Sequence, residues 1–358
     1  MTDKNHPDET VLTIVQGKGT LPREQAGRNI HYDDASLSNY KMVQKGDFII
    51  HLRSFEGGLE MANENGIVSP AYTILRGKKP HSSRFYEAYF HTDEFVNHVL
   101  SKSVEGIRDG RQISYDAFKW LGLPYCSPSE QAKIAELFSV LTKRIEKQTV
   151  LVDSLKKYKR GAIDGLLSRK LHFQTTSSWR EMKISELFSP ISEKGYDNLT
   201  VLTIVQGVGT QPRESVERRI SYEKSNTNTY KRVLENDFIL HLRSFEGGLE
   251  IANSEGIVSP AYTILRAKEQ IIPLFYYAYF RSYWFISNKL RIAVEGIRDG
   301  KSINMETFWN IVVPYPPIEE QKHIAEYLLC LDTKLKKAEA ILDRLKAIKN
   351  GFSQQLFI

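Results

Sequence analysis

The sequence is poor in the features that mark secreted, membrane-bound and metal-binding proteins. Its 358 residues include two cysteines, Cys126 and Cys330, which are too few for a disulfide framework, so both are expected to be ordinary thiols. No apolar run approaches the roughly 18 residues that a membrane helix needs, so no membrane partner is expected. The N-terminal residues MTDKNHPDET lack the basic and apolar stretches of a secretory signal, which predicts a cytoplasmic protein.

Motifs of catalysis are also missing. There is no GxxxxGK[ST] phosphate loop and no His/Cys/Asp cluster with metal-ligand spacing. The run VPYPP at 313–317 superficially resembles the [DN]PP[YF] motif of amino-methyltransferases, but it lacks the leading Asp or Asn. His51 and His241 fall in a strand candidate without a repeated nucleophile, which favours a structural role. We therefore predict that the chain is not an enzyme and carries no metal or cofactor of its own.

Composition indicates a folded, mildly basic protein. Hydrophobic residues make up 41% and charged residues 26% of the chain, close to the averages for globular domains. The formal net charge is +6, which suits a polyanionic partner but is also common in proteins that have none. The net charge alone favours a nucleic-acid partner only modestly.

The dominant feature of the sequence is a duplication. The segment HLRSFEGGLE at 51–60 recurs unchanged at 241–250, and the same offset aligns residues 1–168 with 191–358 without a gap. About 78 of the 168 aligned pairs are identical, which is more than two repeats need merely to share a fold. Any function has to use both copies.

Identity is uneven along the repeat. It is concentrated in residues 11–24, 40–76 and 104–110, whereas the segment 129–168 keeps an apolar pattern and changes most of its other residues. In the first part the two copies therefore share the same residues, whereas in the second part they share only the spacing of apolar residues.

Each repeat is expected to open with a mixed α/β domain. The runs VLTIV, DFIIHLR and IVSPAYTIL, between residues 11 and 75, are strand candidates bounded by turn residues. A helix is expected near 83–101, where the aromatic residues of FYEAYF recur at helical spacing and are interpreted as core. From about residue 130 the pattern predicts a helix of about 38 residues, or roughly 57 Å.

The long helix has a heptad pattern in both copies, interrupted at Gln148 in the first. The apolar positions are Ile134, Phe138, Leu141, Ile145, Val152 and Leu155, and Ile324, Leu328, Leu331, Leu335, Leu342 and Leu345. A helix with such a seam needs a partner, and its own duplicate is the nearest candidate. Antiparallel pairing would relate the halves by a pseudo-twofold axis. The alternative is that each helix packs back on its own domain.

The predicted fold class is therefore α+β, with two mixed α/β domains, each followed by a long helix, and the two helices paired as an antiparallel coiled coil. The expected boundaries are 1–127 for the first domain, 128–168 for its helix, 169–190 for a joint, 191–316 for the second domain and 317–358 for its helix.

Basic and small polar residues recur in segments that resemble loops: GKGTLPR, RSFEGG and RDGR in the first copy. Arginine can pair with phosphate or read guanine, and glycine lets backbone amides approach a phosphate. The alternative for each arginine is a side chain that is solvated or paired within the protein. For Tyr40 and Tyr230, a tyrosine packed in the core is as much expected as a DNA contact. The candidate DNA-binding residues are Lys18, Thr20, Arg23, Tyr40, Lys41, Arg53, Ser54, Arg76, Arg108, Arg111, Thr210, Arg213, Tyr230, Lys231, Arg243, Ser244, Arg266, Arg298 and Lys301.

Taken in order, these motifs resemble the specificity subunit of a type I restriction–modification system. The resemblance rests on the duplicated GDF turn, the SPAYTIL segment, PY, EQ..IA and a heptad helix that ends near GLL or QQLF. The joint segment WREMKISELF also resembles the stretch that introduces a target-recognition domain in that family. The resemblance covers essentially the whole chain.

The resemblance implies a definite role. The two α/β units would be target-recognition domains that each read half of a bipartite double-stranded DNA site, and the helices would dock two methyltransferase subunits. Those subunits would carry S-adenosylmethionine and methylate adenine, while separate motor–nuclease subunits would use ATP and Mg²⁺. The chain itself would be a non-catalytic specificity subunit.

Two departures from the family pattern bear on this role. The introducing segment at 179–188 occurs once, so the first domain starts short or relies on another segment to complete it. The two domains are also close relatives, whereas those of the family usually differ strongly. We therefore hypothesise that the half-sites are the same sequence in inverted orientation. Rival interpretations are a subunit serving a fused methyltransferase–nuclease, a stand-alone twofold DNA-binding regulator, and an enzyme in its own right.

Overall fold

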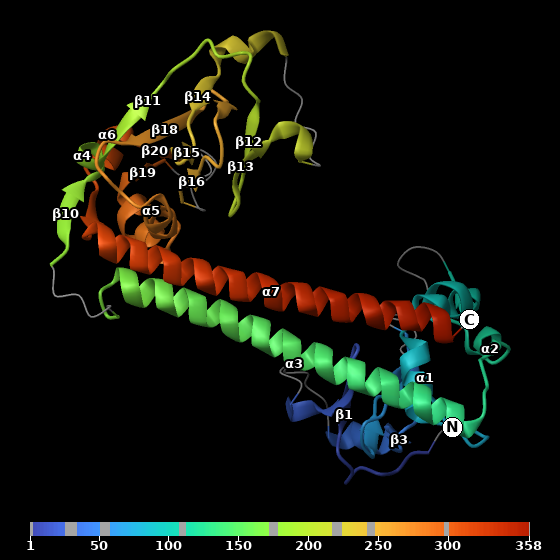
Figure 1. Cartoon of the computed structure of the whole chain (residues 1–358). Coiled ribbons are helices and arrows are strands. Elements are labelled where there is room, and N and C mark those ends of the chain that lie inside the picture. Colours follow the sequence, from blue (N-terminus) through green and yellow to red (C-terminus); the bar gives the residue numbers. More distant parts are fainter. Residues whose placement is uncertain are drawn as a thin grey trace. The chain divides into compact units, whose positions relative to one another are not determined.

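A computed structural model describes residues 3–25, 34–50, 58–106, 112–171, 178–216, 224–241, 248–296 and 301–357. The chain forms two compact units: unit 1 comprises Met1–Leu151 with Ala338–Ile358, and unit 2 comprises Val152–Lys337. The division passes through both long helices, α3 (Pro128–Leu167) and α7 (Ile318–Leu356) (Figure 1). Each unit therefore holds the α/β part of one repeat and a segment of each long helix.

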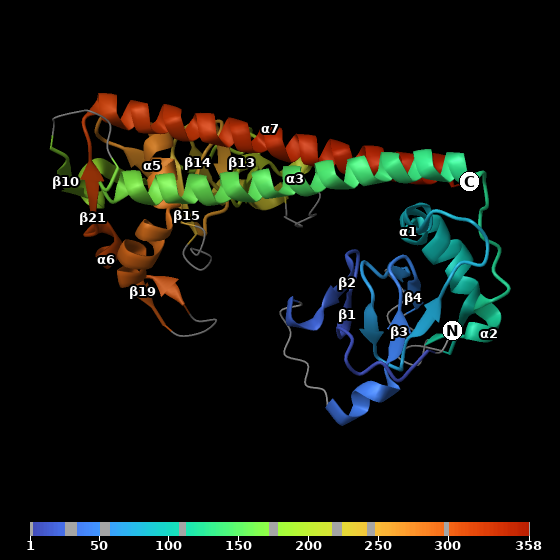
Figure 2. The same cartoon turned by 90° about the horizontal axis from the view of Figure 1, so that it is seen from below.

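The α/β part of unit 1 is built from short antiparallel strands (Figure 2). β1 pairs with β2, β3 with β6 and β8 with β9, and a three-stranded sheet has the order β5–β4–β7. The strands are β1 (Leu12–Val15), β2 (Gly19–Pro22), β3 (Lys41–Val43), β4 (Phe48–Ile50), β5 (Glu60–Met61), β6 (Gly66–Val68), β7 (Thr73–Leu75), β8 (Val104–Glu105) and β9 (Gln112–Ile113). The helices are α1 (Ser83–Phe90), a π-helical turn (Glu94–Val99), a 3-10 turn (Leu100–Ser103) and α2 (Tyr115–Phe118).

Unit 2 repeats this arrangement and adds strands at its start. Its largest sheet has the order β11–β18–β15–β16, and β10 pairs with β21. The strands are β10 (Arg180–Lys183), β11 (Phe188–Ile191), β12 (Leu202–Val205), β13 (Gly209–Pro212), β14 (Lys231–Val233), β15 (Phe238–His241), β16 (Glu250–Ile251), β17 (Gly256–Val258), β18 (Tyr262–Ala267), β19 (Val294–Glu295), β20 (Ser302–Ile303) and β21 (Val312–Tyr315). The helices are α4 (Ile184–Leu187), α5 (Pro273–Phe280), a π-helical turn (Phe285–Lys289), a 3-10 turn (Leu290–Ala293) and α6 (Met305–Trp309).

The strand predictions are confirmed in part. The run VLTIV forms β1, but IVSPAYTIL forms two strands, β6 and β7, because the amide of Tyr72 donates to the carbonyl of Ser69 (3.1 Å) and turns the chain between them. GKGTLPR was expected to be a loop, and this is wrong for its second half, which is strand β2. The residues of that strand pair with β1 over four positions, Leu12↔Pro22 to Val15↔Gly19.

The aromatic repeat in α1 and α5 belongs to the core, as predicted. Phe85, Tyr86, Tyr89 and Phe90 are buried, and so are their equivalents in α5. The helix expected over 83–101 is interrupted: α1 begins after Ser82, whose hydroxyl accepts from the amide of Phe85 (3.3 Å), and ends at Phe90 before the π-helical turn. Capping by a serine side chain is a common way to begin a helix.

A buried glutamine fixes the start of each long helix. Gln131 is fully buried; its side-chain oxygen accepts from the amide of Ser82 (2.9 Å), and its side-chain nitrogen donates to the carbonyl of Cys126 (3.0 Å). Gln321 makes the same pair of bonds, with Ile272 (2.9 Å) and Pro316 (2.8 Å). The glutamine of the EQ..IA motif therefore ties α3 to α1 and α7 to α5.

The predicted heptad positions are all buried or half-buried. The first turns of each long helix pack on the domain of their own repeat, as Ile134 and Phe138 do in unit 1 and Ile324 and Leu328 in unit 2. The last turns of the other long helix enter the same cores, through Phe357 in unit 1 and through Leu166 and Leu167 in unit 2. The interpretation that the helices pack back on their own domains is thus correct for their beginnings.

Polar contacts join α3 and α7 within each unit. In unit 1 Lys349 donates to the hydroxyl of Thr142 (3.0 Å), and Gln148 donates to the carbonyl of Ala338 (2.8 Å). In unit 2 the hydroxyls of Tyr158 and Tyr327 lie 2.7 Å apart, and Lys159 pairs with Asp332.

Several predicted absences can be compared with the described part of the chain. Cys126 and Cys330 are free thiols, as expected. Within the described ranges, no group of three or more His, Cys, Asp or Glu side chains is placed to hold a metal ion. No described helix combines the length and apolar character needed to cross a bilayer.

Candidate nucleic-acid interface

The glycine-containing hairpin of each unit is held from beneath by a buried glutamate. In unit 1 the carboxylate of Glu60, on β5, accepts from the amides of Gly17 (2.6 Å) and Gly19 (2.9 Å). In unit 2 Glu250 accepts from the amide of Gly207 (2.9 Å). The expectation that these amides approach a phosphate is therefore wrong, because a carboxylate of the same chain already occupies them.

Close packing explains why glycine recurs in this hairpin. Gly19 has a φ of 74°, and a Cβ on it would lie 2.5 Å from the carbonyl oxygen of Met61. L-residues rarely adopt this backbone region. The glycine is thus required by the contact between β2 and β5.

Thr20 and Thr210 face the protein interior. Thr20 is fully buried, and its hydroxyl accepts from the amide of Asn63 (3.0 Å). Thr210 makes the same bond with Asn253 (2.9 Å). These side chains join the hairpin to the end of β5 or β16, which gives them a structural role in place of the expected DNA contact.

Arg76 and Arg266 form bidentate ion pairs with buried aspartates. Arg76 donates through Nε and Nη2 to Asp47 (2.7 and 2.5 Å). Arg266 donates in the same way to Asp237 (2.9 and 2.8 Å) and through Nη1 to Glu193 (2.8 Å). The hydrogen bonds of these carboxylates raise the pKa of both guanidinium groups. Arg76 and Arg266 are therefore paired within the protein rather than free to contact DNA, because Nε and Nη2 of each guanidinium group already donate to a carboxylate.

Lys41 and Lys231 also bond within the protein. Their ammonium groups donate to the carbonyls of Tyr72 and Tyr262, at 2.6 Å in each case. Burial lowers the pKa of both lysines. Tyr40 is buried against Leu37, as the packed-tyrosine interpretation predicted, whereas Tyr230 is half-buried.

Other predicted residues differ in exposure. Lys18, in the β1–β2 turn, and Lys301, before β20, are exposed. Arg23 and Arg213 are half-buried, and their positive charge acts to lower the pKa of Tyr72 and Tyr262, although burial outweighs it and the pKa of each tyrosine is raised. The remaining candidates lie outside the described residues: Arg53, Ser54, Arg108, Arg111, Arg243, Ser244 and Arg298.

The surroundings of the buried glutamate differ between the units. His91 lies 3.2 Å from Glu60 in unit 1. Its equivalent in unit 2 is Arg281, which lies 3.4 Å from Glu250 and donates to the hydroxyl of Tyr277 (2.7 Å). A titratable partner in one unit thus corresponds to a permanent cation in the other.

This difference predicts a pH dependence confined to unit 1. Burial acts to lower the pKa of His91, but the hydrogen bond and charge of Glu60 outweigh it, so the pKa is raised. The ion pair of protonated His91 with Glu60 stabilises unit 1 fully at pH values below the pKa of an unfolded histidine, about 6.5. This stabilisation is lost as the pH rises through the folded-state pKa of His91. The carbonyl and the charge of Glu87 also act to raise the pKa of His91, and the carboxylate of Glu87 itself lies near Arg84 and Lys349.

Hydrogen exchange at pH 6 and pH 9 checks this expectation. Protection factors of the Gly17 and Gly19 amides should fall several-fold on raising the pH, while those of Gly207 and Gly209 stay unchanged. The variant His91→Arg should lose the response. An equal fall in both units, or a response that persists in the variant, would contradict the expectation.

The sequence reasoning missed the acidic and amide residues that organise the site. Asp47, Glu60 and Asn63 are each identical in the second repeat, and each bonds to a residue predicted to contact DNA or to its neighbour. Their exact repetition inside a buried, strand-forming stretch was the available signal.

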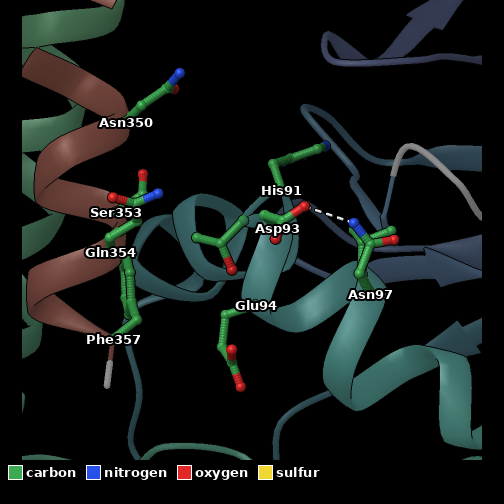
Figure 3. A pocket seen from close by; sticks show the side chains of 10 residues that line it. His91, Asp93, Glu94, Asn97, Asn350, Ser353, Gln354 and Phe357 are labelled. Carbon is green, nitrogen blue, oxygen red and sulfur yellow. Dashed lines mark hydrogen bonds between the residues drawn. The ribbon is translucent and has the colours of Figure 1, made fainter. Parts of the chain in front are cut away.

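A pocket with a cavity volume of about 690 Å³ lies between the π-helical turn of unit 1 and the end of α7 (Figure 3). Its labelled side chains are mostly acidic or amide, and Asn97 donates to Asp93 (2.5 Å). The described lining contains neither lysine nor arginine and includes the carboxylates of Asp93 and Glu94, so, apart from His91, it does not offer a phosphate the cationic partner that phosphate contacts use.

Residues 177–347 match the family described as the type I restriction modification DNA specificity domain. The second repeat belongs to this family. The first repeat is identical to the second at about 78 of 168 positions. The earlier resemblance is confirmed by this match.

Solved structures agree with the specificity-domain fold. The HsdS subunit from Thermoanaerobacter tengcongensis aligns at 14% identity with a TM-score of 0.50, over all of this chain and 93% of that one. The S subunit from M. genitalium aligns at 15% identity with a TM-score of 0.57, over all of this chain and 96% of that one. A chain from a study of complex assembly and conformational transition of the type I R-M system aligns at 14% identity, with a TM-score of 0.56 and 94% coverage of that chain. No curated protein sequence matches the chain.

Proposed function

We propose that the chain is the DNA-recognition subunit of a type I restriction–modification enzyme. The family match of the second repeat, together with a first repeat that is identical to it at about 78 of 168 positions, carries the proposal. Two similar domains suit a bipartite double-stranded target whose halves are inverted copies, because DNA has a local twofold axis. Adenine methyltransferase subunits dock on the chain and, with the motor–nuclease subunits, supply the chemistry.

In this proposal α3 and α7 pair as an antiparallel coiled coil about a pseudo-twofold axis. Gln148 contacts Ala338, which is its own equivalent under the offset of 190. A residue and its equivalent would meet at a twofold axis, so this contact supports the proposed pairing. The pair Lys349–Thr142 is likewise the repeat equivalent of Lys159–Asp332.

The DNA-facing set is narrower than the sequence predicted. Side chains engaged inside the protein, such as those of Thr20, Arg76 and Lys41, shape the scaffold instead. The proposed contacts are the exposed Lys18 and Lys301, the half-buried Arg23 and Arg213, and the residues outside the described ranges, Arg53, Ser54, Arg108, Arg111, Arg243, Ser244 and Arg298.

Sequencing of methylated DNA tests the proposal. A methylation-free bacterial host that expresses the chain with the methyltransferase encoded beside it should carry methyladenine in one interrupted motif with inverted halves. A host lacking the chain is the control. Two unrelated half-sites would overturn the inverted arrangement. Absence of methylation, with tight binding of the isolated chain to an inverted repeat, would instead indicate a stand-alone regulator.

A further inference from the structure

The β1–β2 hairpin of unit 1 and the β12–β13 hairpin of unit 2 differ at one position of the tip. Residues 11–20 read VLTIVQGKGT and residues 201–210 read VLTIVQGVGT, so Lys18 and Val208 are the one difference in this stretch. The strands pair in the same register in both hairpins (Figures 1 and 2). Two equivalent backbones therefore present different side chains.

Three hydrogen bonds fix the backbone of each tip. The amide of Lys18 donates to the carbonyl of Val15 (2.9 Å), and its carbonyl accepts from the side-chain nitrogen of Asn63 (2.7 Å). The amide of Gly17 donates to the buried glutamate beneath the hairpin (2.6 Å). Val208 and the glycine before it make the same three bonds, at 3.0, 2.8 and 2.9 Å. A tip whose backbone is already fixed loses little conformational entropy when it binds a ligand.

The side chains at the tips reach solvent. Lys18 is exposed, and Val208 is 47% exposed although it is apolar. Gln16 and its equivalent Gln206 are exposed as well, and they are identical. Each tip thus offers a glutamine that is common to both units and a neighbouring residue that is not.

The chemistry of the two variable residues separates a base contact from a phosphate contact. The major groove of DNA admits a two-stranded β-ribbon, and there a lysine donates to O6 and N7 of guanine, whereas an apolar side chain contacts the methyl group of thymine. Lys18 could pair with a phosphate, but Val208 has no charge or donor with which to do so. The one role that both side chains can fill at equivalent tips is therefore contact with a base.

We propose that residues 18 and 208 determine the base that each hairpin selects. Lys18 reads a guanine, and Val208 contacts the methyl group of a thymine at the equivalent place. This inference rests on the proposed function and refines it. The half-sites are inverted copies that differ at one base pair, which is G·C in the half read by unit 1 and T·A in the half read by unit 2.

Exchange of the tip residues in the assembled enzyme tests the proposal. The chains Lys18→Val, Val208→Lys and the double exchange are each expressed with the methyltransferase in a methylation-free host, and the methylated DNA is sequenced. Each new residue is native to the equivalent hairpin, so the backbone accepts it. Lys18→Val should give a motif with thymine in both halves, and Val208→Lys a motif with guanine in both. The double exchange should restore the wild-type motif, because a double-stranded site with exchanged halves is the same site read from the other end.

Binding measurements add a matched control. The purified complex of the chain with the methyltransferase is titrated with duplexes that carry guanine or thymine at the position read by unit 1. The wild type should prefer guanine by roughly tenfold or more, and Lys18→Val should prefer thymine. The control is Lys143→Thr, which removes an equal charge from an exposed position of α3 whose equivalent is Thr333. It should leave both the base preference and the methylated motif unchanged.

Three outcomes would overturn the inference and leave the proposed function in place. They are a wild-type motif with the same base in both halves, a motif that none of the exchanges alters, and a loss of binding in Lys18→Val that is equal for both duplexes and lowers the salt dependence, as a phosphate contact would. Absence of methylation by the wild type would instead overturn the inference together with the proposed function.

Discussion

Replacing Arg266 with alanine is expected to destabilise unit 2 by about 3 kcal/mol, because it leaves a buried carboxylate without its cation. Asp237 is almost fully buried, and among the described residues the amide of Leu234 (2.8 Å) is the one donor left at its Oδ2 once Arg266 is lost. The low end of the usual range applies since a quarter of the Arg266 side chain reaches solvent. Urea unfolding with hydrogen exchange in β15 and β18 measures the change.

Two variants accompany this measurement. Arg232→Ala removes ion pairs with Glu255 (2.5 Å) and Glu193 (3.4 Å), whose carboxylates both reach solvent, and it should cost much less than Arg266→Ala because neither carboxylate is left buried. Arg266→Lys keeps the charge but loses the bidentate geometry and should fall between the two. If Arg266→Ala were as stable as Arg232→Ala and weakened only DNA binding, the DNA contact predicted from sequence would be restored.

Replacing Phe188 with alanine should cost about 3–5 kcal/mol in unit 2, the usual range for removing a fully buried ring. Its ring lies 5.6 to 5.7 Å, centroid to centroid, from the rings of Phe238, Tyr276 and Phe280. Loss of the ring leaves a cavity beneath β11, so amides of β11 and β18 should exchange faster.

Unit 1 provides the internal control for this variant. Phe188 packs in the core of unit 2, so exchange in β4 and β7 should not change. Ser189→Ala, at the next position of β11, keeps the strand and the ring and should be close to wild type. A Phe188→Ala chain that unfolds at the same urea concentration as Ser189→Ala would contradict the assigned packing.

Apolar periodicity was sufficient to predict the long helices and the aromatic core. The heptad positions from Ile134 to Leu155 and from Ile324 to Leu345 are buried or half-buried. Burial of apolar area depends on spacing along one element, which sequence displays directly.

The roles of the basic residues could not be predicted in the same way. Arg76 meets Asp47 across 29 residues, and Lys41 meets the carbonyl of Tyr72 across 31. These partners are set by the pairing of β4 with β7 and of β3 with β6. Strand register depends on tertiary packing, so an arginine that pairs internally and one that faces DNA look alike in sequence.

The glycines illustrate the same limit. Their repetition correctly indicated a special backbone, but the acceptor for Gly17 and Gly19 is Glu60, some forty positions later in the chain. A phosphate and a buried carboxylate both accept hydrogen bonds from backbone amides. Only the fold distinguishes a site built for a ligand from one already filled by the protein.

The residue that follows α7 packs in a core that is otherwise encoded near the start of the sequence. Phe357 packs between Phe85, Tyr89 and Phe138, at 5.3 to 5.5 Å between ring centroids, although more than 200 residues separate it from any of them. A frameshift or stop codon just upstream of Phe357 would therefore open a cavity in the core of unit 1, most of which is encoded at the opposite end of the gene. The core of unit 1 is thus completed by a residue from the far end of the sequence.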